Sequence, residues 1–501
     1  MQRVAIADLG SNSWRLVVYG YEPDTPWWSL VDEIREAVRI SAGLADTGEL
    51  QPERIDRALH TAAVFDSFCR SLDIDQVETV ATSAVRDARN GAQLLQDIRE
   101  NTDLDPRVIS GDEEARYGYL AIVNSTTIEH GFGLDMGGGS IQALGIEDRR
   151  LSAAQSLPLG SVRVSEEYLP GKKAPKKAMK ALRTRVSEEL EELEWWTGGG
   201  RIVGIGGTIR NLAAAAMKRA DLPSLDVQGF ELELDALEEL IELLASRPAD
   251  RRGDVAGIKP DRGDVILGGA LVLAAALDSG GFDRIEVTEA GLREGILFER
   301  ICGPEGLFED VRRESVENLA HRFNNDPGHV GRVAALSLAV FDGLEEAGLH
   351  DLGSEERELL WAGCLLHDIG TAIAYDDHHR HSHYLVLNAG LPGFSPRELV
   401  LIGLIARYHR KGDPDASELG DLAETGDDDR LHLLSGIIRL AEQFERSRDG
   451  AIRQVSVVTD NGTVTLDTEV DPARDSSVPI WAARRNADLL SEALGLQVEI
   501  A

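Results

Sequence analysis

The sequence predicts an α/β protein with two lobes around a cleft, followed by an all-α domain and a small α+β C-terminal segment. Apolar runs typical of strands alternate with helical patterns up to about residue 300. A unit of strand, aspartate, glycine-containing turn and strand occurs at residues 4–21 and again at 131–146. Beyond this region the pattern becomes helical, and ten of the twelve histidines lie from His321 onward. We place the domains at 1–125, 126–305, 306–450 and 451–501.

The length of 501 residues also favours several domains, because one hydrophobic core rarely serves so long a chain. Acidic residues outnumber basic ones 87 to 52, so we expect no nucleic-acid partner. No window approaches the uncharged apolar length of a transmembrane helix, so we expect no membrane partner. The N-terminus lacks a signal-peptide pattern and the three cysteines are isolated, which predicts a cytoplasmic location.

Lysine is scarce: only eight of the 52 basic residues are lysines, and five of these lie within residues 172–180. An acidic, lysine-poor surface is typical of proteins kept soluble in concentrated salt, so we predict a halophilic source. The self-repulsion of such a surface needs salt to screen it. The basic run itself is either a solvated helix face or the entrance for a polyanionic substrate.

The first repeated unit, VAIADLGSNSWRLVVYGY at residues 4–21, predicts a β-hairpin whose turn follows Asp8. Gly10, Ser11 and Asn12 lie in that turn. Glycine lets backbone N–H groups approach an oxyanion closely, and an aspartate at a strand end can hold a divalent cation. The unit therefore predicts one half of a phosphate-binding site.

The second unit, GFGLDMGGGSIQALGI at residues 131–146, places Asp135 before a similar turn. Its turn residues are Gly137, Gly138, Gly139 and Ser140. Two such turns facing each other would grip a phosphate group beside a cation that neutralises its charge. Because the unit occurs once in each half, we expect the site to lie between the lobes, with Asp8 and Asp135 meeting there.

Two further segments have the pattern of anion-binding groups. Residues 76–91 predict a strand followed by a helix start that carries Arg86, which is either a phosphate ligand or a solvent-facing residue after an ordinary helix cap. Residues 201–216 predict a strand, a double glycine and a helix. Gly206, Gly207 and Thr208 of this segment form a third phosphate-type loop.

Residues 106–122 predict a short strand and a helix that opens on Asp112, Glu113 and Glu114. Acidic residues in the first turn of a helix commonly complement its dipole. Alternatively, one of the glutamates faces the phosphate site and activates a water molecule, since a carboxylate within hydrogen-bond reach is a suitable general base.

The helical part is rich in histidine. His329, the His367-Asp368 pair, His378, His381, His383 and His409 lie on successive predicted helices or their loops. Imidazoles that converge with a carboxylate hold one or two transition metals, although spacing alone leaves surface histidines as the alternative. Near the C-terminus, residues 452–471 alternate around an Asn-Gly turn, which predicts a hairpin, and a last helix is expected near residues 480–495.

Seven motifs occur in a characteristic order: DLGSNSWRL, TSAVRDA, SGDEEAR, DMGGGSIQ, LPLGSVR, GIGGTIRNLA and EAGLREGIL. In this set the chain resembles the exopolyphosphatase/guanosine pentaphosphate phosphatase (Ppx/GppA) family, which has the fold shared by actin, sugar kinases and heat-shock ATPases. The remainder resembles the HD-type helical domain often fused to that family, through His329, LLHDIG at 365–370, HHRHSHYLV at 378–386 and ARYH at 406–409.

The resemblance implies hydrolysis of a terminal phosphate from inorganic polyphosphate or guanosine pentaphosphate, with Mg²⁺ or Mn²⁺, by a homodimer. It implies that Asp8 and Asp135 bind the cation, and that Glu114, with Glu113 as the fallback, is the base. The implied phosphate-binding residues are Gly10, Ser11, Asn12, Arg86, Gly137, Gly138, Gly139, Ser140, Gly206, Gly207 and Thr208. In the HD-type domain it implies a second site, for a transition metal, formed by His329, His367, Asp368, His381, His409 and Glu442.

Two positions depart from the usual pattern. Gln142 stands where the family motif GGGSTE has a glutamate, and Glu442 stands where HD-type sequences have an aspartate. An amide is not a base and binds Mg²⁺ more weakly than a carboxylate, whereas glutamate still binds metals with a longer stem.

Exopolyphosphatase activity is therefore the leading hypothesis, with guanosine pentaphosphate hydrolysis as its close alternative. Gln142 favours a second alternative, a sensor that binds polyphosphate or a nucleotide without hydrolysing it. The third is an HD phosphohydrolase in the helical part.

Overall fold

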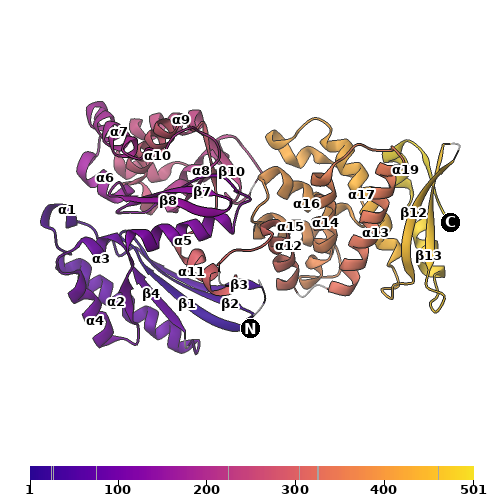
Figure 1. The fold of residues 1–501 in the computed structure, drawn as a ribbon, viewed down its shortest axis with the longest axis horizontal. Helices are drawn as coiled ribbons and strands as arrows, with labels where there is room; N and C mark the ends of the chain where they lie inside the picture. Colours follow the sequence, from indigo (N-terminus) through magenta and orange to yellow (C-terminus); the bar gives the residue numbers. More distant parts are fainter. Residues whose placement is uncertain are drawn as a thin grey trace. The chain divides into compact units, whose positions relative to one another are not determined.

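The computed structural model describes residues 1–23, 25, 27–74, 76–223, 225–303, 305–323, 326–460 and 462–501. The chain divides into two compact units (Figure 1). The N-terminal unit comprises Met1–Asp221 and Val227–Val311, and the C-terminal unit comprises Leu222–Asp226 and Arg312–Ala501.

The first lobe of the N-terminal unit is built on a five-stranded sheet in the order β3-β2-β1-β4-β5. Its strands are β1 (Gln2–Leu9), β2 (Trp14–Tyr21), β3 (Trp28–Glu36), β4 (Val77–Ala81) and β5 (Pro106–Val108). The first three form an antiparallel meander, and β4 and β5 run parallel to β1. The predicted hairpin is present: Leu9 pairs with Trp14, so residues 10–13 form the turn.

The second lobe has a six-stranded sheet in the order β10-β11-β9-β6-β7-β8. Its strands are β6 (Gly131–Met136), β7 (Ile141–Glu147), β8 (Arg150–Leu157), β9 (Ile202–Ile205), β10 (Phe230–Glu233) and β11 (Arg284–Val287). As in the first lobe, the first three strands, β6, β7 and β8, form an antiparallel meander. Strands β9 and β11 then run parallel to β6. The repeat seen in the two turns thus extends to the topology of both sheets.

Two helices lie between the sheets, α5 (Gly111–Val123) and α11 (Leu292–Ile301) (Figure 1). Their apolar side chains share one core with Ile6 of the first sheet and Ile205 of the second. Burial of this shared apolar surface holds the lobes together. The first turn of α5 is therefore placed close to both sheets.

Further helices of the N-terminal unit lie on the outer faces of the two sheets or at the ends of their strands (Figure 1). They are α1 (Leu44–Thr47), α2 (Pro52–Ser71), α3 (Ser83–Asp87), α4 (Gly91–Asn101), α6 (Ser161–Tyr168), α7 (Lys176–Glu191), α8 (Gly207–Arg219), α9 (Leu234–Ser246) and α10 (Ile266–Gly280). Phe65 of α2 and Ile98 of α4, for example, pack with Ala5 and Ala7 of β1. Short 3-10 turns occupy Ala249–Asp254 and Pro260–Arg262.

The region after residue 310 is helical, as predicted. Its helices are α12 (Val311–Arg322), α13 (Pro327–Glu346), α14 (Ser354–Leu366), α15 (His378–Ala389), α16 (Pro396–Tyr408) and α17 (Asp427–Phe444), with 3-10 turns at Ile369–Ala372 and Ala416–Leu422. Apolar faces of these helices form one core, in which Val340, Ile402 and Ile437 are fully buried. No helix among the described residues combines the length and the hydrophobicity needed to cross a lipid bilayer.

The C-terminal end contains a three-stranded sheet in the order β12-β13-β14. Strands β12 (Ile452–Asp460) and β13 (Thr463–Val470) are antiparallel, and β14 (Gln497–Ile500) runs parallel to β13. The prediction of one helix near residues 480–495 was wrong, since the structure has α18 (Ser477–Arg484) and α19 (Asp488–Leu494). Asn486 Nδ2 donates to the carbonyl oxygen of Ala482 at 2.8 Å, an interaction that ends the first helix.

Candidate functional site

The turns at residues 10–13 and 137–140 lie against each other. A Cβ atom on Gly138 would be 3.2 Å from Ser11 Cβ and 3.5 Å from the backbone nitrogen of Asn12. One on Gly139 would be 2.4 Å from Ser83 Oγ and 3.1 Å from Ser11 Oγ, so glycine at these positions leaves room for the close approach. Ser11 Oγ and Ser83 Oγ are 3.0 Å apart and hydrogen-bonded. We call this meeting point of β1, β6 and α3 the inter-lobe site.

The start of α6 holds the second turn in place. The backbone N–H groups of Ser161 and Val162 donate to the carbonyl oxygens of Gly137 (3.0 Å) and Gly138 (2.9 Å). Arg163 Nε donates to the carbonyl oxygen of Gly139 at 2.9 Å. In contrast, no described residue accepts a hydrogen bond from the N–H of Gly138 or Gly139. These N–H groups are available to an anion.

Three acidic side chains of the inter-lobe site influence one another. Burial, and then the charge of Asp8, raise the pKa of Asp135 to about 7. Burial, and then the charge of Asp135, raise the pKa of Glu114 to about 7, against the opposing effect of Arg86. Burial also raises the pKa of Asp8. Carboxyl groups that raise one another's pKa are stabilised in their ionised form by a cation bound among them.

The hydrogen bonds of the Gln142 side chain indicate whether the inter-lobe site suits a cation. This fully buried residue lies opposite Asp135 in the β6–β7 ladder. Its Nε2 donates to Ser140 Oγ (3.0 Å) and Ser156 Oγ (3.1 Å), while its Oε1 has no hydrogen-bond partner among the described residues. An unpaired buried oxygen on the residue opposite Asp135 matches the oxygen ligands that Mg²⁺ and Mn²⁺ prefer.

The two glutamates of α5 have different surroundings. Glu113 Oε2 accepts a hydrogen bond from the N–H of Ser110 at 2.9 Å in a capping box, and its Oε1 accepts one from Arg107 at 2.7 Å. Glu114 is buried, and its Oε2 accepts a hydrogen bond from Arg86 Nη1 at 3.2 Å. Glu113 is thus engaged in stabilising the helix, whereas Glu114 belongs to the inter-lobe site.

The third predicted loop also reaches the end of β6. Gly206 has a φ of 109°, and a Cβ there would lie 2.4 Å from the carbonyl oxygen of Met136. Gly207 begins α8, and the buried Thr208 Oγ1 has no hydrogen-bond partner in the described part of the chain. The loop therefore brings an unpaired hydroxyl and a helix N-terminus beside the strand that carries Asp135.

Two family models match this chain. The model of the Ppx/GppA phosphatase family matches residues 21–302, and that of Ppx/GppA phosphatase domain III matches residues 311–474. The chain belongs to the Ppx/GppA phosphatase family.

Solved structures of this family are similar to the chain. The Ppx/GppA family member of Aquifex aeolicus is 26% identical with a TM-score of 0.52, and the match covers 60% of this chain and 98% of that one. An exopolyphosphatase-like protein is 26% identical with a TM-score of 0.54, covering 60% and 98%. An exopolyphosphatase from Cytophaga hutchinsonii shares the fold at 22% identity with a TM-score of 0.56, covering 61% and 100%.

The inter-lobe site of this Ppx/GppA family member includes basic residues that the sequence analysis did not assign to it. They are Arg15, Arg35, Arg210, Lys259, Arg262 and Arg293. Arg293 Nη1 lies 3.6 Å from Asp8 Oδ2, and Arg15 lies opposite Asp8 in the β1–β2 ladder. The register of the first hairpin could have revealed Arg15, whereas Arg293 comes from α11, and the motif EAGLREGIL that contains it gives no indication that it reaches Asp8.

These basic side chains affect one another strongly. Burial, with the neighbouring charges of Arg293 and Arg210, lowers the pKa of Arg15 to about 10. Burial and the charge of Arg35 lower the pKa of Arg262 to about 10. Guanidinium groups packed this closely create a positive potential in an otherwise acidic protein, and such a potential attracts polyanions.

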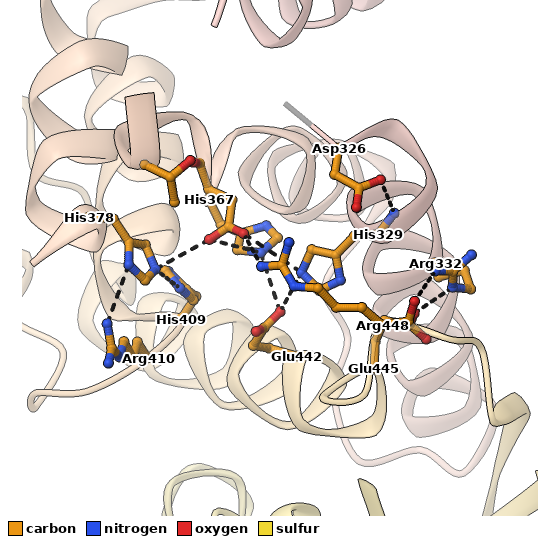
Figure 2. Close-up of polar contacts among 12 residues, drawn as sticks. Asp326, His329, Arg332, His367, His378, His409, Arg410, Glu442, Glu445 and Arg448 are labelled. Atoms are coloured by element: carbon orange, nitrogen blue, oxygen red, sulfur yellow. Dashed lines mark hydrogen bonds and ion pairs between the residues drawn. The ribbon is translucent and has the colours of Figure 1, made fainter. Parts of the chain in front are cut away.

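The residues predicted for the second metal site lie in the C-terminal unit of this family member. His329, His367, Asp368, His409 and Glu442 converge, and Figure 2 shows the histidines and Glu442 directed toward a common region. His378 also belongs to this cluster, whereas His381 is in neither of the groups that could hold a metal ion in the described part of the chain. The sequence offered four histidines between residues 378 and 383, and only the packing of α15 distinguishes them.

Proposed function

We propose that this Ppx/GppA family member is an exopolyphosphatase that removes the terminal phosphate of inorganic polyphosphate with Mg²⁺ or Mn²⁺. One observation carries the proposal: Asp8, Asp135 and Glu114 gather where two glycine turns with available N–H groups meet. Family membership supports phosphatase chemistry, and a similar solved protein is described as exopolyphosphatase-like.

We assign Asp8, Asp135 and Gln142 Oε1 as ligands of the cation. When bound, the cation would polarise the terminal phosphoryl group and neutralise part of its charge. The N–H groups of Gly138 and Gly139 would donate to the oxygens of the same phosphoryl group. These groups are positioned before the reaction begins, so they stabilise developing charge without reorganisation.

Glu114 is our candidate for the general base. In the proposed step, the oxygen of a water molecule bonds to the terminal phosphorus as the bridging P–O bond breaks. Glu114 accepts the proton that the water loses, and the products are orthophosphate and a chain one phosphate shorter. Arg86, 3.2 Å from Glu114 Oε2, orients the carboxylate.

The basic residues support polyphosphate as the substrate. A phosphate chain carries a negative charge at every repeat, and basic side chains are concentrated near Asp8: the charges of Arg293 and Arg15 act on Asp8, and those of Arg210 and Arg35 act on Arg15. Guanosine pentaphosphate carries fewer phosphates and needs recognition of a base. The charge distribution therefore favours the longer polyanion.

Phosphate release from long-chain polyphosphate and from guanosine pentaphosphate, measured in parallel at high KCl, tests the proposal. We expect Mg²⁺-dependent release from polyphosphate that Asp135→Asn abolishes. Asp148→Asn is the matched control, because Asp148 is exposed in the turn after β7 and Asn tolerates its left-handed φ of 51°. Faster hydrolysis of guanosine pentaphosphate would make that nucleotide the substrate in place of polyphosphate. No phosphate release from either compound would disprove the proposed phosphatase activity.

Gln142 is the observation that favours a second candidate, a sensor that binds polyphosphate without hydrolysing it. The residue contributes an amide where the family pattern has a carboxylate. Equilibrium binding of polyphosphate with no phosphate release by the wild type, together with release by Gln142→Glu, would establish the sensor instead.

We also propose that the helical part of the C-terminal unit is an HD-type domain. The support is the adjacent pair His367 and Asp368, which are 0% and 5% exposed and lie with His329 in one group that could hold a metal ion. Loss of metal binding from this unit on Asp368→Asn would support the assignment, and binding unaffected by the substitution would contradict it.

A further inference from the structure

A cavity of about 250 Å³ lies in the C-terminal unit, between α13, the start of β12 and the turn after β13. Its lining contains three arginines, Arg332, Arg453 and Arg474, and one acidic residue, Asp471. Acidic residues outnumber basic ones 87 to 52 in the whole chain, so this lining reverses the usual balance of charge. We call the cavity the arginine pocket. Its composition suits an anion.

The apolar part of the lining is fixed by the hydrophobic core. Leu336 of α13 and Ile452 of β12 are 3% and 2% exposed and belong to the core that packs the helices against the C-terminal sheet. Side chains in a close-packed core have little freedom to move. The helix and the strand that carry two of the arginines are therefore held at a constant separation.

Asp471 brings two of the arginines together. Its Oδ2 lies 3.1 Å from Arg453 Nη2 and 3.5 Å from Arg474 Nε. Asp471 is itself held in place: its backbone N–H donates to the carbonyl oxygen of Ala451 at 2.8 Å, and its Oδ1 accepts a hydrogen bond from the N–H of Ala473 at 2.9 Å. One fixed carboxylate thus positions two guanidinium groups side by side.

Arg332 is anchored independently of Asp471. Its Nε donates to Oε1 of the buried Glu445 at 2.6 Å, and its Nη2 makes a longer contact of 3.4 Å with the carbonyl oxygen of Arg448 (Figure 2). A buried carboxylate that accepts a charged hydrogen bond holds its partner firmly. The position of the third guanidinium group is therefore also set before any ligand binds.

Gly450 gives the arginines room to converge. It has a φ of 68°, and a Cβ atom there would lie 3.1 Å from Arg474 Nη1 and 3.3 Å from Arg332 Cδ. These two side chains therefore both approach residue 450, and Arg453 joins them through the shared contact at Asp471. Any larger residue would be strained in this conformation and would crowd the pocket.

Most donors of the pocket remain available. A guanidinium group carries five N–H bonds, yet in the described chain the side chains of Arg453 and Arg474 meet no acceptor other than Asp471. Both side chains are about half exposed, at 52% and 45%, so water satisfies the other donors. Three guanidinium charges exceed those of Asp471 and the anchoring Glu445 together. An anion with several oxygens can replace this water and meet the excess positive charge.

The shape of the pocket distinguishes between anions. The tetrahedral oxygens of a phosphate group can accept from guanidinium groups that approach from three directions, whereas a carboxylate has only two oxygens in one plane. Pockets for drug-sized ligands measure roughly 300 to 1,000 Å³. The arginine pocket, at about 250 Å³, is smaller than these and suits a compact ligand.

We propose that the arginine pocket binds a small phosphate anion, orthophosphate or pyrophosphate. Arg332, Arg453 and Arg474 donate to its oxygens, and Asp471 positions two of these arginines without contacting the anion. The pocket belongs to the C-terminal unit and shares no residue with the inter-lobe site. The proposal therefore does not depend on the proposed phosphatase activity.

Calorimetric titration of the full chain tests the proposal. Orthophosphate and pyrophosphate are titrated separately, without divalent cations and at one KCl concentration, because salt screens the attraction. Arg474→Gln leaves the inter-lobe site intact, so its difference from the wild type reports the arginine pocket. We expect the affinity of the pocket to fall about tenfold or more, since a charged hydrogen bond is lost. Identical titrations of the two proteins would overturn the proposal.

Arg446→Gln is the matched control. It removes the same charge from an exposed arginine just after α17, in the same unit but outside the lining of the pocket. We expect it to bind both anions like the wild type. Equal weakening in Arg446→Gln and Arg474→Gln would show that the anions respond only to the total charge of the unit, and would refute a specific pocket.

Crystals of the wild type give a readout that does not depend on whether a variant folds. Tungstate is a tetrahedral oxyanion with strong anomalous scattering, and a soak should give a peak among Arg332, Arg453 and Arg474. The absence of that peak would contradict the proposal. Titration with long-chain polyphosphate identifies the source of the phosphate group: binding that depends on Arg474 for the long chain, but not for orthophosphate or pyrophosphate, would replace the small anion by a polymer segment.

Discussion

Asp135 on β6 lies directly opposite Gln142 on β7, so the two side chains leave the same face of the sheet. The amide nitrogen of Gln142 is bound by Ser140 and Ser156, and its oxygen remains unpaired among the described residues. Residue 142, a glutamate in the family motif, therefore still presents a side-chain oxygen that can bind a cation, but this oxygen carries no charge.

Gln142→Glu should strengthen cation binding. The new carboxylate would add a charge beside Asp135, and we expect the Mg²⁺ concentration for half-maximal activity to fall about tenfold, equivalent to about 1.4 kcal/mol. The titration of activity with Mg²⁺ measures this. Gln155→Glu on the adjacent strand β8 is the control, because Gln155 is exposed and should leave the titration unchanged. An unaltered titration in Gln142→Glu would remove residue 142 from the cation site.

Glu114→Gln should lower kcat by about 10² to 10⁴ with little change in fold, because the amide cannot accept the proton of the attacking water. Glu113→Gln should retain kcat, since glutamine still completes the capping box at the start of α5. Steady-state kinetics of the two variants decides between adjacent glutamates. The opposite pattern would transfer the role of base to Glu113.

The metal-free protein should become less stable as the pH rises toward 7. The pKa of Asp135 is raised from 3.8 to about 7, so the folded protein keeps a proton that the unfolded chain releases. This contribution to the free energy of unfolding is fully present below the unfolded pKa and is lost as the pH passes the folded pKa. Urea unfolding at about pH 5 and about pH 8 measures the change, and Mg²⁺ should reduce it by favouring the ionised form.

Asp135→Asn separates this effect from the general acidity of the surface. The variant keeps every surface carboxylate but has no proton to lose at residue 135, so its stability should vary less with pH. A pH dependence identical to that of the wild type would show that Asp135 does not titrate in this range.

The strand ends and turns of the inter-lobe site could be predicted because their signals are local. Each turn combines a strand pattern, an aspartate and glycines within one short stretch, and the same combination in both halves indicated that the turns face each other. The opposition of Asp8 and Arg15 is likewise a consequence of the hairpin register. In contrast, Arg293 reaches Asp8 because α11 packs between the sheets, and this depends on contacts distant in sequence.

The same distinction holds in the C-terminal unit. The His367-Asp368 pair was visible because its residues are adjacent. The choice of His378 over His381 depends on how α15 meets the end of α16, where His378 and His409 are 3.1 Å apart. A histidine-rich stretch contains no information about that contact. Strand β14 was missed for a different reason, since four residues after a predicted helix have too little alternation to identify a strand.

Gly139→Ala should damage the inter-lobe site by crowding its two hydrogen-bonded serines. The added methyl group would meet Ser83 Oγ at 2.4 Å and Ser11 Oγ at 3.1 Å, so the serine side chains or the second turn must move. A displacement of about 1 Å commonly costs about 10²-fold in rate, and we expect a loss of this order in kcat/KM. Gly171→Ala, whose nearest neighbour would be the Lys173 carbonyl oxygen at 3.9 Å, is the control. Normal activity in Gly139→Ala would show that the close approach of residue 139 to the two serines is not needed.

The folded protein should require salt. Its formal net charge of −35 spreads repulsion over the surface, and raising the salt from about 0.1 M to about 1 M shortens the Debye length from about 10 Å to about 3 Å. The Tm should therefore rise steeply with KCl over this range and then level off once the repulsion is screened. Sucrose at equal osmolality stabilises proteins by exclusion from the surface but screens no charge, so it should raise the Tm much less. Equal effects of sucrose and KCl would show that electrostatic repulsion is not what the salt relieves.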